Sequence, residues 1–136
     1  MHFPALNIFI ADEDSDEIEF FKEAMEDISC NAIITSAKDG EELMNLLDRL
    51  PIPDAIVLEL RLPMLNGFDC LERLRANYNL VNVPIIILTS CDTWNKIYCL
   101  RNGANLYIEK VCTQSEMKII AQQICDAKSL VNSPVI

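Results

Sequence analysis

The 136-residue sequence has no long hydrophobic run and few basic residues. No apolar stretch approaches the ~20 residues that a membrane-spanning helix needs, and residues 1–4 lack the basic flank of a signal peptide. We therefore expect a cytoplasmic protein with no membrane segment. The 11 Lys and Arg are outnumbered by 21 Asp and Glu, which gives a net charge of −10, and residues 1–90 carry the acidic excess. Such a charge repels nucleic acid, so the partners are expected to be proteins.

Closely spaced metal-ligand pairs are also missing. The only histidine is His2, and none of the six cysteines forms a C-x-x-C pair, so no zinc site is expected. Most of the cysteines fall inside apolar-periodic segments, where a thiol acts as a small hydrophobic side chain. We expect reduced, mostly buried thiols at all six positions, which are Cys30, Cys70, Cys91, Cys99, Cys112 and Cys125.

The sequence does contain five short apolar runs of strand length. They cover residues 8–11, 32–35, 55–58, 85–88 and 106–108. Continuous Ile, Val and Leu runs of this kind are typical of strands buried on both faces of a parallel sheet. Stretches with apolar residues three or four apart separate them and predict five helices. The pattern predicts one α/β domain, a doubly wound five-stranded parallel sheet with helices on both faces.

Two of the predicted helices begin with capping-box sequences, at Asp39 and at Thr113. In two others the apolar stripe predicts which side chains are buried. The third helix has a stripe at Phe68, Leu71, the Arg75 stem and Tyr78, and the fourth has one at Ile97, Leu100 and Ala104.

Reactive side chains follow four of the five runs. Asp12 and Glu13 follow the first run, Glu59 the third, Thr89 the fourth and Lys110 the fifth. Because ligands bind at the carboxyl ends of strands in such sheets, these residues should converge on one pocket. Clustered carboxylates with a hydroxyl and an ammonium suit a weakly bound Mg²⁺ and a phosphoryl group.

Four stretches in order resemble the receiver domains of two-component response regulators. They are residues 8–14 (IFIADED), 53–68 (PDAIVLELRLPMLNGF), 85–90 (IIILTS) and 103–110 (GANLYIEK). The resemblance implies a flavodoxin-like fold with strand order 2-1-3-4-5, over a core of about residues 5–128. It also implies that Asp12 and Glu13 are the metal-binding acid pair, with Glu59 as a further metal ligand. By the same resemblance, Thr89 is the switch hydroxyl, Tyr107 the switch aromatic, and Lys110 the lysine that pairs with the acyl phosphate.

The chain departs from the receiver pattern at two positions. Receivers carry their phosphate-accepting aspartate where this chain has Glu59, whose extra methylene moves the carboxylate by ~1.5 Å. In-line transfer is sensitive to displacements of about 1 Å, so we expect little or no ordinary phosphorylation. The second departure is Val111, where receivers usually carry proline after the lysine. A cis peptide is not expected at Val111, and the reach of Lys110 into the site is open.

The resemblance predicts a stand-alone receiver, residues 1–136, with no output domain and no enzymatic activity. Its partners would be a sensor histidine kinase or a downstream target. Trp94 and Tyr98 lie four residues apart on the fourth predicted helix, and we expect them on a partner-binding face. Whether Glu59 mimics a phosphoryl group or leaves an inert site is open, and so is a homodimer.

A phosphohydrolase of the haloacid-dehalogenase type is the alternative. In that family an aspartate after an apolar strand is the nucleophile, and Asp12 with Asp14, Thr89 and Lys110 follows the same motif order. The family needs a further acidic pair beyond the lysine. This chain offers only acids within a predicted helix there, which disfavours the alternative.

Overall fold

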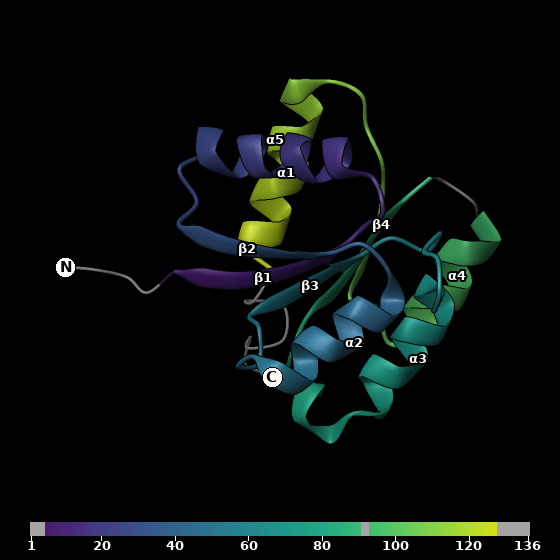
Figure 1. Ribbon diagram of the computed structural model, residues 1–136. Helices are drawn as coiled ribbons and strands as arrows, with labels where there is room; N and C mark the ends of the chain where they lie inside the picture. The colour runs from purple at the N-terminus through teal and green to yellow at the C-terminus, as the bar shows by residue number, and fades with distance from the viewer. Residues whose placement is uncertain (1–4, 91–92, 128–136) are drawn as a thin grey trace, which may run out of the picture.

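The computed structural model describes residues 5–90 and 93–127, and its centre is a five-stranded parallel sheet (Figure 1). The strand order is β2-β1-β3-β4-β5, as predicted. The strands are β1 (Leu6–Ala11), β2 (Ala32–Ala37), β3 (Ala55–Leu58), β4 (Ile85–Thr89) and β5 (Leu106–Glu109). Each strand coincides with one of the apolar runs, so the predicted fold is confirmed.

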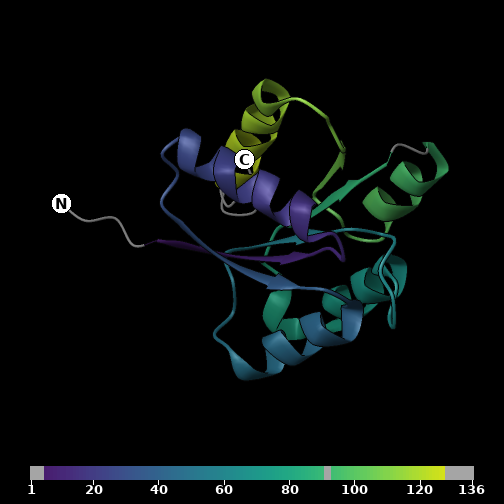
Figure 2. The same ribbon diagram turned by 45° about the horizontal axis from the view of Figure 1, so that its top comes forward.

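Helices cover both faces of the sheet, as Figures 1 and 2 show. One face carries α1 (Ser15–Asp27) and α5 (Gln114–Cys125), and the other carries α2 (Gly40–Arg49), α3 (Gly67–Ala76) and α4 (Thr93–Arg101). Ile8 and Ile10 of β1 pack on the α1 side, whereas Phe9 packs on the other. This alternation along one strand produces two apolar cores, one on each face. None of the described helices has the length and apolar character that a membrane crossing requires.

The predicted helix starts are present. The Asp39 side chain accepts a hydrogen bond from the Glu42 N–H at 2.8 Å, and Thr113 Oγ1 accepts one from the Glu116 N–H at 3.2 Å. Asp14 caps α1 in the same way by accepting from the Asp16 N–H at 2.9 Å. These caps satisfy N–H groups that have no partner within the helix, and so fix where each helix begins after its strand.

The helical stripes were predicted wrongly at three positions. Helix α3 ends at Ala76, so Tyr78 lies beyond it, at the start of the short 3₁₀ turn η1 (Tyr78–Leu80), with 89% of its surface exposed. In α4, Ile97 and Leu100 are more than 40% exposed, and the buried residue is Cys99. Helix α4 therefore packs on the sheet through a narrow face and leaves most of its apolar surface outside.

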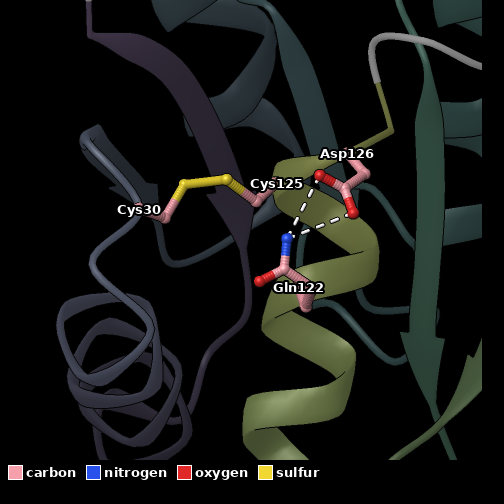
Figure 3. Close-up of a disulfide and its surroundings, with 4 residues drawn as sticks. All are labelled: Cys30, Gln122, Cys125 and Asp126. Carbon is pink, nitrogen blue, oxygen red and sulfur yellow. Dashed lines mark hydrogen bonds between the residues drawn. A yellow bond between two sulfur atoms is a disulfide. The ribbon is translucent and has the colours of Figure 1, made fainter.

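Cys30 and Cys125 form a disulfide, which corrects the expectation that all six thiols are reduced (Figure 3). Their Cα atoms are 6.4 Å apart across a sequence separation of 95 residues. The pairing arises because α5 packs against α1, so that the end of α5 meets the chain entering β2. Local spacing carries no signal for such a contact. Cys70 and Cys99 are free and buried and Cys112 is free and exposed, whereas Cys91 and His2 lie outside the described residues.

Candidate functional site

Three of the predicted site residues are fixed by backbone hydrogen bonds that continue the sheet beyond the strand ends. The Asp12 N–H donates to the Ala37 carbonyl at 3.0 Å, and the Glu59 N–H donates to the Ala11 carbonyl at 3.0 Å. The Lys110 N–H donates to the Thr89 carbonyl at 2.8 Å. The main chain is therefore ordered up to each of these residues, and their side chains start from the same edge of the sheet.

The side chains of Asp12, Glu59 and Lys110 meet in one charged cluster. Lys110 Nζ lies 3.0 Å from Asp12 Oδ2 and 3.5 Å from Glu59 Oε2. Asp12 is 4% exposed and Glu59 6% exposed, so both carboxylates are almost removed from water. Glu59 Oε2 is a buried oxygen with no hydrogen-bond partner in the structure. One ammonium thus compensates two buried carboxylates, and a negative charge remains in a region of low dielectric.

The environment of Lys110 shifts its pKa through opposing effects. Burial is the largest effect and lowers the pKa, because it disfavours the charged ammonium. The hydrogen bond to Asp12 and the negative charges of Asp12, Glu59 and Glu17 outweigh burial, so the pKa of Lys110 is raised above its usual 10.5. Lys110 therefore stays charged at neutral pH. Its reach, which Val111 had left open, is established by the 3.0 Å contact, with no cis peptide bond in the described part of the chain.

Glu17 is a member of this acidic environment that sequence reasoning missed. It lies in the first turn of α1, half-buried, and burial raises its pKa above the usual 4.5. Lys110 opposes this shift, while the negative charges of Asp12, Asp14 and Glu59 add to it. A possible signal was its position three residues after the capping Asp14, on the first turn of a helix that begins at the site.

Glu13 does not join the cluster. Its side chain is exposed and lines a separate shallow hollow with Ser15 and Lys38. Within residues 5–90 and 93–127, no group of three or more His, Cys, Asp or Glu side chains is arranged to hold a metal ion. The structure therefore brings together two of the three carboxylates predicted as metal ligands, Asp12 and Glu59, with the Lys110 ammonium beside both.

Thr89 and Tyr107 lie next to this cluster on β4 and β5. Thr89 is 2% exposed, and its carbonyl accepts the hydrogen bond from Lys110 described above. The Tyr107 hydroxyl donates to the Ser90 carbonyl at 3.3 Å, and its ring packs against the core on the α3 and α4 side. Tyr107 thus contacts the chain that leaves β4 just after Thr89, so a shift of that segment would be transmitted to Tyr107.

The segment after Glu59 is held by a close approach that only glycine permits. The Gly67 N–H donates to the Leu60 carbonyl at 2.9 Å. A Cβ at Gly67 would overlap the Glu59 carbonyl and the Leu60 Cα. Because these contacts are with backbone atoms, a side chain at position 67 could not be accommodated without moving the strand end that presents Glu59.

Trp94 and Tyr98 line a groove of about 580 Å³ between α3 and α4, away from the charged cluster. Trp94 is 80% exposed and Tyr98 40% exposed. The rings of Tyr98 and Phe68 pack in a T-shaped arrangement with centroids 5.4 Å apart, and Ile97 and Arg101 also border the groove. The groove presents aromatic surface with a cation at its border, a composition enriched in protein interfaces.

Comparison with known proteins identifies the family of this chain. Residues 8–122 match the family model of the response regulator receiver domain. The chain belongs to this family of two-component signalling proteins. Receiver domains are generally signalling proteins rather than enzymes, and the match does not support the phosphohydrolase alternative based on Asp12.

Curated relatives of this receiver differ in length. The receiver is 31% identical over 111 residues to the transcriptional regulatory protein CpxR of Escherichia coli K12. This alignment covers 81% of the receiver chain and 45% of CpxR. An uncharacterized 14.6 kDa protein of Leptolyngbya boryana is 29% identical over 121 residues, covering 88% of this chain and 90% of that protein. The receiver thus spans less than half of CpxR but most of the Leptolyngbya protein.

Solved structures show the same fold. The receiver domain of the Francisella response regulator 1452 is 31% identical, with a TM-score of 0.73 and coverage of 89% of this chain and 97% of that one. The phosphorylated cyanobacterial phytochrome response regulator RcpA has a TM-score of 0.83 at 21% identity, covering 97% of this chain and 98% of that one. At 21% identity, the similarity to RcpA shows a shared fold and no more.

Proposed function

We propose that this receiver works in two-component signalling by protein contact and without phosphorylation. The observation that carries the proposal is the engagement of Lys110 by two buried carboxylates, Asp12 at 3.0 Å and Glu59 at 3.5 Å. In the receiver pattern the lysine pairs with the acyl phosphate on an aspartate. Here its charge is already balanced by the protein, and the acceptor position carries Glu59.

The geometry around Glu59 supports this proposal in two ways. Phosphorylation of Glu59 would replace its single negative charge with the roughly two charges of a phosphoryl group, in a buried site where one carboxylate oxygen already has no hydrogen-bond partner. In addition, the Gly67 backbone lies close against the Glu59 carbonyl and the Leu60 Cα, which leaves the strand end little room to shift and offset the extra methylene. Near-attack geometry for phosphoryl transfer would therefore be lost.

Mg²⁺ would bind this receiver weakly. Asp12 and Glu59 supply buried carboxylate oxygens, which are the ligands that Mg²⁺ prefers, and it often needs only one or two of them. Glu59 Oε2, which makes no hydrogen bond and faces Lys110 at 3.5 Å, could accept such a cation. However, the Lys110 ammonium lies against both carboxylates, so Mg²⁺ would have to compete with a positive charge already in the site. Glu13, which is exposed and outside the charged cluster, would not supply a third carboxylate.

The partner face would be the α3 and α4 groove, with Trp94 and Tyr98 as its aromatic anchors. Exposed aromatic side chains dominate the energy of many protein interfaces. A sensor histidine kinase, a downstream target or a second copy of the receiver are the partners that the family suggests, in a cytoplasmic setting.

Treatment with acetyl phosphate tests the proposal directly. Wild-type receiver should gain no phosphoryl group by intact-mass measurement. Glu59→Asp should gain one that hydroxylamine removes, as expected of an acyl phosphate, because the shorter side chain restores the acceptor and Lys110 already reaches the site. Glu59→Asp with Lys110→Met is the matched control and should lose it. A stable phosphoryl adduct on wild-type Glu59 would refute phosphorylation independence.

A further inference from the structure

The Cys30–Cys125 disulfide ties the end of α5 to the segment that enters β2. Cys30 lies two residues before β2, and Cys125 is the last residue of α5 (Figure 3). Both are at the opposite end of α5 from Lys110, which lies just before that helix. The cross-link therefore acts on the far end of the helix and does not involve the charged cluster.

Accessibility separates this pair from the buried cysteines. Cys70 and Cys99 are fully buried, and burial raises the pKa of each thiol to about 11. Cys30 and Cys125 are only half-buried. A hollow of about 140 Å³ opens beside Cys30, bordered by Lys22, Met25, Glu26, Ala32 and Ile34. This hollow is the route by which a small thiol would reach Cys30 in the folded domain.

Other contacts hold α5 in place when the cross-link is open. Met117, Ile120 and Ile124 are buried against the sheet and α1. Hydrogen bonds also hold the end of the helix. The Asp126 N–H donates to the Gln122 and Ile124 carbonyls, and the Gln122 side-chain amide donates to the Asp126 carboxylate at 3.1 Å (Figure 3). Opening the disulfide would thus leave the buried face of α5 packed, Ile124 included, and remove the covalent tie between its last turn and the segment before β2.

We propose that Cys30 and Cys125 form a reversible redox site whose reduction by a cellular dithiol releases the last turn of α5. A thiolate of the dithiol attacks Cys30 Sγ and forms a mixed disulfide, while Cys125 leaves as a thiolate and takes up a proton. The second thiol of the reductant then attacks the mixed disulfide and displaces Cys30. The net reaction transfers two electrons and two protons to the cysteine pair and converts the dithiol to its disulfide.

Glutathione redox buffers applied to the full folded chain test reversibility. After equilibration and acid quench, alkylation and peptide mapping would measure the bonded fraction of Cys30 and Cys125. That fraction should follow the ratio of reduced to oxidised glutathione from both directions, and Cys112→Ser, which removes the one exposed free thiol among the described residues, should behave the same. A pair that stays bonded in every buffer without denaturant, or that stays reduced in oxidised glutathione, would overturn the proposal.

Amide hydrogen exchange tests the release of the helix end. Amides of residues 122–126 should exchange about tenfold faster in the reduced protein, whereas amides around the buried Phe21 of α1 should not change. Cys30→Ser under oxidising conditions should reproduce the reduced pattern, and Cys125→Ser provides an independent second variant. Equal exchange at residues 122–126 in the oxidised and reduced wild type would show that the cross-link does not control this turn.

Discussion

Lys110 and Asp12 are joined by a 3.0 Å hydrogen-bonded ion pair across 98 positions of sequence. They follow β5 and β1, which are not neighbours in the sheet, because β3 and β4 lie between them. The Lys110 side chain therefore reaches back across two strand ends, past Glu59, which follows β3. This pair links the edge strand β5 to the interior strand β1 and makes the charged cluster a structural element as well as a site.

Removal of the Lys110 charge should destabilise the fold. Lys110→Met leaves two buried carboxylates without a cation, and loss of one partner from a buried ion pair costs about 3 kcal/mol. Urea denaturation would measure the change in free energy of unfolding. Lys118→Met is the matched control, because its pair with Asp27, at 3.9 Å, is exposed and should contribute under about 0.5 kcal/mol. Equal losses in the two variants would contradict a structural role for Lys110.

Glu17→Gln should stabilise the receiver at neutral pH. The raised pKa of Glu17 means that the folded state binds the proton more tightly than the unfolded state. Ionisation therefore costs stability above the folded-state pKa, and the cost disappears once the pH falls below 4.5, where both states are protonated. The melting temperature of Glu17→Gln should exceed that of wild type at pH 7 and match it at pH 4. Glu23→Gln, at an exposed position of the same helix, should show neither effect.

The strand ends could be predicted from the sequence, and with them most of the site. Continuous apolar runs mark buried parallel strands whatever their neighbours, so Asp12, Glu59, Thr89 and Lys110 were placed correctly at one edge of the sheet. Features that depend on how a helix is rotated about its axis could not be predicted from the sequence. The outward face of α4 and the disulfide both follow from helix packing, which leaves no local pattern in the chain.

Mg²⁺ should bind with a dissociation constant in the millimolar range. Two carboxylates and retained waters make an open site of the kind that holds Mg²⁺ loosely, and Lys110 competes for the same oxygens. Amide chemical shifts at Asp12 and Glu59 during titration would measure the affinity. Lys110→Met should bind more tightly than wild type, because the competing charge is gone. Unchanged shifts in both proteins up to high concentration would contradict a metal site here.

Trp94→Ala should weaken partner binding at least tenfold. Trp94 is 80% exposed beside a groove of aromatic side chains, and a tryptophan buried at an interface commonly contributes 2 kcal/mol or more. A partner first captured by the full chain and then purified would be titrated by calorimetry. Ile119→Ala, which removes an exposed apolar side chain from α5, is the control and should bind as wild type does. Equal loss in both variants would place the interface elsewhere.

Glu59→Gln should separate the two ways in which an unphosphorylated receiver can work. The substitution keeps the shape of the side chain and removes the charge that lies 3.5 Å from Lys110. If Glu59 mimics a phosphoryl group, Lys110 loses this ion pair and keeps only its contact with Asp12, and the Tyr107 side chain shifts with the segment at Ser90. The free energy of binding to a partner that prefers the active-like state should then be less favourable by about 1 to 3 kcal/mol, the usual range of coupling between sites.

Calorimetry with the purified partner would measure this change in binding free energy. Glu13→Gln, at an exposed position, is the matched control and should bind as wild type does. Equal affinities for wild type and Glu59→Gln would rule out the mimic, because the groove would then bind without reference to the charged cluster.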